Sequence, residues 1–537
     1  MPGAPRAARH AEGPAVSLPL DLLMFVGLGL FLVSGVPMVF VLAGTAILFA
    51  LLGAALGVFS LPLLGALIPR VFSVMTSETL VAIPLFVFMG LMLERSKIAE
   101  ELLEAMGRMF GRVRGGLAVS VSLVGMLLAA STGIVGATTV TMGLMALPVM
   151  LRRGYRPEFA CGSICAAGTL GQIIPPSTVM VVMGEVLSAA YQQAQFAQGK
   201  FSVETVSVGQ LFAGSLLPGL LLVGLYIVFQ LGYSFLRPQV APALTGQAGD
   251  DKRPSARELF HALVPPLALI AAVLGSILGG IATPTEAAAI GAVGATLLAA
   301  RRVEGRSRWA VWTVVGCSVV LLALARGFDL RLGRDGVAPG DQAAIYAAQA
   351  AALLLVAGLA VVLRDLGRSG VLGAAAGATM SINAMVFSIV IGASLFSLVF
   401  IGLGGETRVE RLLSDLPGGT TGALLAVMAT IFFLGMWLDY VEISIIVIPV
   451  VGPFLMKAGV DPIWFGVMVA LAMQTSFLTP PVGYTLSYLR AVAPRSVTTG
   501  MIWRGAAPFV ALQITAMGIV ALWPQLATWL PRLLFAK

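Results

Sequence analysis

Residues 131–178 read STGIVGATTVTMGLMALPVMLRRGYRPEFACGSICAAGTLGQIIPPST, and this stretch decides the fold. It is apolar enough for a bilayer, yet two polar segments interrupt it, STGIVGATT at 131–139 and TLGQIIPPST at 169–178. A similar stretch occupies residues 435–486. Broken apolar segments at corresponding positions in the two halves of a chain indicate the binding site of a secondary transporter.

The second stretch repeats the parts of the first in the same order. LDYVEIS at 438–444 is its first polar break, and TSFLTPPVG at 475–483 corresponds to TLGQIIPPS. Pro480 and Pro481 match Pro175 and Pro176. One such break alone favours a proline-kinked pair of ordinary helices, but two breaks paired in order and spacing favour a functional site.

The composition of the chain restricts its class. Of its 537 residues 58% are hydrophobic and only 11% are charged, whereas soluble domains carry about 25% charged residues. So few charges do not cover a surface that faces water on all sides, which predicts an all-α polytopic membrane protein. We attribute the net charge of +8 to basic cytoplasmic loops, with no nucleic-acid partner.

The chain contains few residues that catalyse reactions or bind transition metals. Its histidines are His10 and His261, and its cysteines, Cys161, Cys165 and Cys317, lie in apolar segments as small buried hydrophobes. We therefore expect no transition metal, no cofactor and no enzymatic activity.

The breaks in the apolar segments expose backbone groups that can bind ions. An interrupted helix in lipid leaves N–H and C=O groups unpaired, which persists only where the chain is buried in protein or lines a polar cavity. Exposed carbonyl and hydroxyl oxygens are hard ligands that suit Na⁺. Helix N-termini at the same breaks attract an anion.

Several polar residues have alternative interpretations. For Asp439 we favour a functional carboxylate over a solvated one, because an ionisable group at the membrane centre costs at least about 2.5–3.5 kcal/mol. Glu442 fits a functional or an interfacial role equally. Gln172 and Gln474 either satisfy local backbone or contact a polar ligand. The glutamate of TPTE at 283–286 fits a helix-capping box at least as well as a substrate role.

Several motifs together resemble the large membrane subunit of tripartite ATP-independent periplasmic (TRAP) transporters. They are IPLFVFMGLMLERSKIAEEL (83–102), LPVMLRRGYRPEFACG, TLGQIIPPS, GGIATPTEAAAIGAVGA (279–295), GMWLD and TPPVG, and the resemblance extends from about residue 20 to 529. It implies an elevator-type transporter with two inverted repeats, each with a helical hairpin and a broken helix. It also implies Na⁺ as the coupling ion and a multi-pass location in the bacterial inner (cytoplasmic) membrane.

The same resemblance implies partners. A soluble periplasmic binding protein delivers the substrate, typically an organic anion that carries a carboxylate, and a small four-helix membrane subunit supports the scaffold. The alternatives are a stand-alone Na⁺-coupled carboxylate carrier, which needs no binding protein, and an ion channel, which conducts without saturable Na⁺-dependent uptake.

The resemblance also divides the chain into regions. These are a cytoplasmic tail at 1–18, a first inverted repeat at 19–300 with a hairpin near 117–151 and a broken helix near 158–190, an inserted pair of transmembrane helices at 301–370, and a second repeat at 371–537 with a hairpin near 420–456, a broken helix near 462–490 and a last span. The first hairpin tip departs from the family's Gly-Ser pattern but keeps hydroxyls. The inserted pair adds surface for the small subunit or lipid, although we favour a neutral decoration.

Carried over by motif, the breaks give two sets of predicted site residues. The cation-binding residues are Ser131, Thr132, Gly133, Gly136, Thr169, Gly171, Pro175, Asp439, Thr475, Thr479 and Pro480. The substrate-binding residues are Thr138, Thr139, Gln172, Ser177, Glu442, Gln474 and Gly483.

Overall fold

The computed structural model describes residues 19–96, 98–243, 255–302, 307–331 and 339–535. Every regular element within these ranges is a helix, which confirms the predicted all-α class. The tail predicted at residues 1–18 lies outside the described residues.

The first half of the chain contains the first broken stretch. Its helices are α1 (Leu20–Val33), α2 (Met38–Ala55), η1 (Leu61–Ala66), α3 (Leu67–Thr76), α4 (Ala82–Arg95), α5 (Ile98–Phe110), α6 (Gly116–Thr132), α7 (Val135–Arg152), α8 (Pro157–Thr169), η2 (Leu170–Gln172), α9 (Thr178–Ala197) and α10 (Val208–Leu236). The stretch predicted as a hairpin holds α6 and α7, and the one predicted as a broken helix holds α8, η2 and α9.

The second half contains the insertion and the second broken stretch. Its helices are α11 (Ala256–Leu278), α12 (Pro284–Ala300), α13 (Ser307–Gly327), α14 (Pro339–Arg368), α15 (Val371–Gly402), α16 (Gly405–Ser414), α17 (Gly419–Leu434), α18 (Tyr440–Ile446), α19 (Ile448–Lys457), α20 (Pro462–Phe477), α21 (Tyr484–Val492), α22 (Thr499–Leu522) and α23 (Gln525–Phe535). The final apolar segment is two helices, because a helix rarely continues through a residue that precedes a proline, here Trp523 before Pro524.

Helix length and composition give the candidate membrane spans. Among the described residues, seven helices are long and apolar enough to cross a bilayer, or eight if the bent pair α18 and α19 forms one span. Seven shorter apolar helices of 10–17 residues accompany them, including α6, α17 and α20. Helices shorter than the roughly 20 residues of an uninterrupted span are consistent with broken spans and hairpins.

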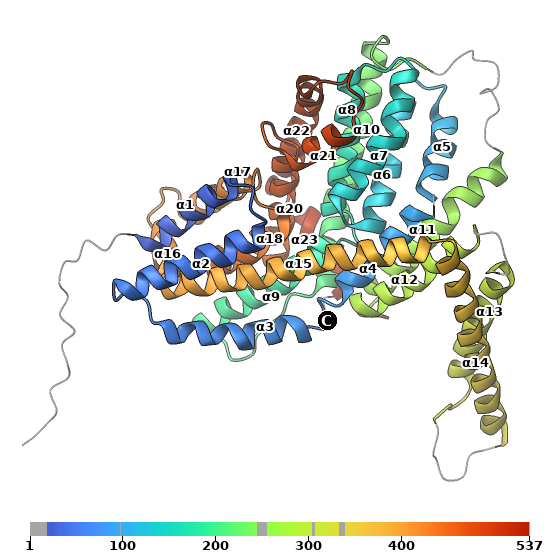
Figure 1. Cartoon of the computed structure of the whole chain (residues 1–537), viewed down its shortest axis with the longest axis horizontal. Coiled ribbons are helices and arrows are strands. Elements are labelled where there is room, and N and C mark those ends of the chain that lie inside the picture. The colour runs from blue at the N-terminus through green and yellow to red at the C-terminus, as the bar shows by residue number, and fades with distance from the viewer. Residues whose placement is uncertain (1–18, 97, 244–254, 303–306, 332–338, 536–537) are drawn as a thin grey trace, which may run out of the picture.

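The long helix α15 organises one side of the molecule. It packs against α2 and α4 and crosses the molecule in Figure 1. The Phe25 ring of α1 meets the rings of Phe396 and Phe400 edge to face, with centroids 5.3 and 5.2 Å apart. Such aromatic contacts hold α1 on α15 in a well-packed scaffold.

The helices α13 and α14, which we predicted as an inserted pair, pack mainly on each other and project from the other helices in Figure 1. A Cβ at Gly358 of α14 would lie 2.8 Å from the Val314 side chain of α13, so this glycine permits close packing of the pair. Only 17% of the membrane-length window of each helix is buried. The hairpin therefore leaves most of its apolar surface free to face lipid or another protein.

The TPTE segment begins α12 as a capping box. The Thr283 side chain accepts from the Glu286 N–H at 3.3 Å, and Glu286 Oε2 accepts from the Thr283 N–H at 2.8 Å. This pairing satisfies two N–H groups at the start of the helix. The structure thus supports the capping interpretation of Glu286.

Candidate functional site

The first hairpin break is shorter than the polar segment in the sequence. α6 ends at Thr132, Gly133 adopts φ +60°, Ile134 is extended, and α7 begins at Val135. Glycine adopts a positive φ at no steric cost, so Gly133 sets the position where the two hairpin helices separate. The side chains of Ser131 and Thr132 lie outside the described residues.

Two predicted substrate-binding threonines lie in the first turns of α7 rather than in a loop. Thr138 Oγ1 donates to the Ile134 carbonyl at 3.1 Å, and Thr139 Oγ1 donates to the Val135 carbonyl at 2.8 Å. Such bonds to the carbonyl four residues earlier satisfy a hydroxyl within its own helix. Both hydroxyls are therefore satisfied within α7, which continues through residues that the sequence assigned to a break.

The first broken helix is interrupted at its predicted prolines. α8 ends at Thr169, one 3-10 turn follows, and α9 begins at Thr178. The peptide bond between Pro175 and Pro176 is cis. Ser177 Oγ donates to the Gln172 carbonyl at 3.2 Å, which satisfies one of the backbone groups that the interruption leaves unpaired.

A hydrogen bond joins the two breaks of the first repeat. Thr178 Oγ1, on the first residue of α9, donates to the Gly133 carbonyl at 3.1 Å. A Cβ at Gly171 would lie 3.7 Å from the backbone of Gly133 and Ile134. The predicted cation-binding residues Gly133 and Gly171 are therefore neighbours.

The second repeat joins its two breaks in the same way. α17 ends at Leu434 and α18 begins at Tyr440, so the break covers residues 435–439. Tyr484, the first residue of α21, donates its hydroxyl to the Trp437 carbonyl at 2.5 Å. In both repeats, the first residue of the second half of the broken helix thus bonds a carbonyl in the hairpin break.

Removal of the Tyr484 hydroxyl should weaken this connection. We expect Tyr484→Phe to leave the Trp437 carbonyl without this donor, to cost about 1 kcal/mol, and to lower transport several-fold at normal expression. Thermal unfolding and proteoliposome uptake test this. Tyr346→Phe on the exposed surface of α14 is the matched control, and equal behaviour of the two variants would refute the role of the bond.

Asp439 and Glu442 form the cap of α18. Asp439 Oδ1 accepts from the Tyr440 N–H at 2.7 Å, and Glu442 Oε2 accepts from the Asp439 N–H at 2.8 Å. Glu442 is 4% exposed. The capping bonds use one oxygen of each carboxylate, and a ligand role for the remaining oxygens stays a prediction.

A buried polar cluster connects the two broken helices. Thr169 Oγ1 at the end of α8 accepts from Gln474 Nε2 of α20 and from Gln513 Nε2 of α22, each at 3.1 Å. Gln513 Nε2 also donates to the Tyr226 hydroxyl of α10 at 2.8 Å. Each of these four side chains is fully buried. The sequence reasoning missed Gln513 and Tyr226; the signal was a glutamine inside an apolar helix.

Replacement of Thr169 by valine should destabilise the protein. The valine keeps the shape but removes the acceptor of Gln474, and a buried donor left unpaired costs about 1–3 kcal/mol. We expect a lower Tm for Thr169→Val and a Tm near that of the parent protein for Thr169→Ser, which keeps the hydroxyl. If both variants unfold at the same temperature, the cluster does not stabilise the junction.

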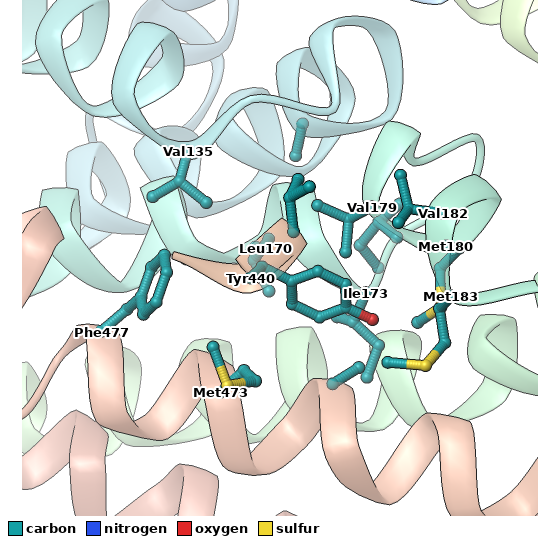
Figure 2. Close-up of a cluster of buried hydrophobic side chains, with 14 of the residues drawn as sticks. Val135, Leu170, Ile173, Val179, Met180, Val182, Met183, Tyr440, Met473 and Phe477 are labelled. Atoms are coloured by element: carbon teal, nitrogen blue, oxygen red, sulfur yellow. The ribbon is translucent and has the colours of Figure 1, made fainter. Parts of the chain in front are cut away.

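Several buried polar atoms near the breaks have no hydrogen-bond partner among the described residues. They are Gln172 Oε1 and Nε2, Gln474 Oε1, Gln513 Oε1, Ser476 Oγ and Thr485 Oγ1. Figure 2 shows the Tyr440 ring beside Leu170 and Ile173 of the first broken helix, with Met473 of α20 on its other side. The second hairpin therefore contacts the first broken helix, and buried polar atoms without a hydrogen-bond partner lie at this junction.

The remaining predicted residues are engaged in local hydrogen bonds or in close helix packing. Thr475 Oγ1 donates to the Leu471 carbonyl and Thr479 Oγ1 to the Thr475 carbonyl, both at 2.7 Å, so these hydroxyls serve their own helix end. Pro480 precedes a cis peptide bond, and Gly483 caps α21. A Cβ at Gly136 would lie 3.2 Å from the Tyr488 ring, so this glycine lets α7 pack on α21.

Solved transporter structures share the fold. The structural match to the YdaH transporter of Alcanivorax borkumensis has a TM-score of 0.50 at 14% sequence identity and covers 95% of this chain and 98% of that one. The match to MtrF of Neisseria gonorrhoeae has a TM-score of 0.50 at 12% identity and covers 95% and 96%. Similarity at this level of identity concerns the fold alone.

The sequence comparisons identify the family. The chain is 29% identical over 460 residues to the C4-dicarboxylate TRAP transporter large permease protein DctM of Vibrio cholerae serotype O1, covering 85% of this chain and 86% of that relative. The family model described as the DctM component of tripartite ATP-independent periplasmic transporters matches residues 25–325 and 310–526. The chain therefore belongs to the DctM family, the large permease component of TRAP transporters, and is a membrane transport protein rather than an enzyme.

Proposed function

We propose that this chain uses a Na⁺ gradient to import an organic anion that carries a carboxylate. A periplasmic binding protein delivers the anion, and a small four-helix subunit completes the complex in the bacterial inner membrane. The single observation that carries the proposal is the junction at which Thr169 and Gln474, one from each broken helix, share a buried hydrogen bond at 3.1 Å. The junction supports one common site rather than two separate breaks.

The chemistry of the junction suits a cation and an anion together. Helices that end near one another present free carbonyl oxygens, and helices that begin there present free N–H groups. Gln172 is 1% exposed, and neither its Oε1 nor its Nε2 has a partner among the described residues. Because an unsatisfied buried polar group costs about 1–3 kcal/mol, a bound ion or substrate that supplies partners is favoured.

The nature of the substrate rests on the relatives. The printed name of the Vibrio cholerae relative gives C4-dicarboxylates. A second relative, 25% identical and covering 94% of this chain, is named the ectoine transporter permease TeaC of Halomonas elongata. Ectoine is a zwitterion, so the two named substrates share a carboxylate but not a net charge. We propose that the substrate carries a carboxylate and is an organic anion like that of the first relative, and that the binding protein contributes to its selection.

The movement we propose is an elevator. The bonds from Thr178 to Gly133 and from Tyr484 to Trp437 tie each hairpin to its broken helix. The Thr169–Gln474 bond ties the two repeats together. Helices joined in this way move as one body, and α15 with α1, α2 and α4 forms the packed scaffold against which that body slides.

Reconstituted transport tests the proposal. The purified chain is reconstituted in proteoliposomes with the proposed small subunit and periplasmic binding protein, and uptake is measured with and without an inward Na⁺ gradient. We expect uptake only with the gradient and with the binding protein. Uptake that is unchanged without Na⁺ would refute the coupling, and full uptake without the binding protein would favour a stand-alone carrier.

A further inference from the structure

A charged cleft lies where α5, α11, α12 and α13 meet, on the side of the molecule from which the inserted hairpin projects in Figure 1. Its volume is about 580 Å³. Four arginines line it, Arg108 from α5, Arg301 and Arg302 directly after the end of α12, and Arg308 from α13. The cleft is distinct from the junction of the broken helices and takes no part in the proposed transport chemistry.

Two of the four arginines are neutralised within the cleft. Arg302 forms an ion pair with Glu101, and Arg108 forms one with Glu104 on the same helix. Glu258, the remaining glutamate of the lining, accepts a backbone N–H in the capping box of its own helix α11. The acidic side chains of the cleft are thus engaged with other groups.

The other two arginines form no ion pair with any carboxylate in the described part of the chain. Arg301 lies over the ring of Trp312, with its guanidinium carbon 5.8 Å from the ring centroid. Arg308 is exposed at the start of α13. Trp309 and Trp312 are 83% and 63% exposed. Exposed tryptophans beside arginines are typical of the level of the lipid headgroups.

The surface of α13 continues from the cleft as an apolar stripe. Arg308, Trp312, Val315 and Val319 recur at intervals of three or four residues, so they share one face of the helix. The valines on this face are 38% and 60% exposed. A positive group at one end of an exposed apolar stripe matches a molecule with an anionic head and hydrocarbon chains, rather than a free anion.

We propose that this cleft binds the phosphodiester headgroup of an anionic phospholipid, with Arg301 and Arg308 holding the phosphate and the acyl chains lying along α13. Guanidinium groups bind phosphate oxygens in pairs of hydrogen bonds, and basic pockets between transmembrane helices on the cytoplasmic side bind such headgroups. Because α5 connects α4 to α6, the lipid holds this connection against α11 and α12. The inserted hairpin thereby has a function as one wall of a lipid site.

Lipid titration of the full-length chain in detergent tests the proposal. The ligands are phosphatidylglycerol, phosphatidylcholine and inorganic phosphate, and the readout is the saturable rise in Tm. We expect phosphatidylglycerol alone to raise the Tm at low concentration, and Arg301→Gln/Arg308→Gln to weaken its binding about thirtyfold. The control is Arg411→Gln/Arg495→Gln, which removes the same charge from exposed positions outside the cleft and should bind as the parent chain does.

Three results would overturn the proposal. Phosphatidylcholine giving the same rise would mean that the surface has no preference for anionic lipid, and inorganic phosphate giving it would mean a free-anion site. Equal binding by the two double variants would mean that these arginines do not hold the headgroup. If the double glutamine variant does not fold, each single variant is titrated instead; an affinity loss of about fivefold each supports the proposal, and unchanged affinity refutes it.

Discussion

Replacement of Asp439 by asparagine should lower the apparent Na⁺ affinity of transport at least about tenfold while the protein still folds. Asparagine caps a helix as well as aspartate does, so the bond to the Tyr440 N–H survives and only the negative charge is lost. An interaction with a charged group contributes about 1.5–3 kcal/mol, and about 1.4 kcal/mol corresponds to a factor of ten in binding. The measurement is the Na⁺ dependence of uptake in proteoliposomes.

Two further variants separate the charge of Asp439 from its capping role. Asp439→Ala removes both and should cost about 1 kcal/mol of additional stability. Asp415→Asn, at an exposed carboxylate beside the end of α16, removes a charge far from the breaks and should transport as the parent protein does. Parent-like Na⁺ dependence in Asp439→Asn would reduce Asp439 to a helix cap.

The membrane class, the proline breaks and the family were predictable from the sequence, because they depend on the low content of charged residues and on local motifs. The all-helical membrane class follows from the low content of charged residues, 11%. Lipid offers no hydrogen-bond partners, and an α-helix pairs its backbone groups within itself. Proline pairs mark both broken helices, since a proline removes a donor and its ring blocks the preceding turn. The motifs that resemble the TRAP family led to the family that the comparisons identify.

The exact extent of the breaks was not predictable from polarity. Thr138 and Thr139 look like loop residues, but each returns its hydroxyl to its own helix and lets the helix continue. Asp439 and Glu442 likewise start a helix inside a segment assigned to a break. Hydroxyl and carboxylate groups serve loops and helix ends alike, so composition does not distinguish the two.

Contacts between distant residues were also invisible in the sequence. Thr169 and Gln513 lie 344 positions apart, and no local pattern pairs them. The equivalent bonds from Thr178 and Tyr484 use different residue types to reach a hairpin carbonyl. Because the residue types differ, aligning the side chains of the two repeats does not reveal that these bonds are equivalent. Their equivalence is visible only in the structure, where each donor is the first residue of its helix.

Replacement of Gly505 by alanine should be among the most destabilising single substitutions in the chain. Helices α8 and α22 approach so closely that a Cβ at Gly505 would lie 1.9 Å from the Glu158 carbonyl oxygen. Backbone atoms cannot move aside as a side-chain rotamer does, so the helices must separate, at a cost of about 1–3 kcal/mol or more. Separation would also pull Gln513 of α22 from Thr169 of α8, so uptake should fall together with the Tm.

Gly518 on the same helix α22 supplies the matched control. A Cβ there meets no heavy atom within 4 Å, and alanine favours a helix over glycine by roughly 0.5–1 kcal/mol. Gly518→Ala should therefore have a Tm equal to or higher than that of the parent protein and should transport normally, although it is the same glycine-to-alanine substitution as Gly505→Ala. Equal Tm values for the two variants would contradict the close approach of α8 and α22.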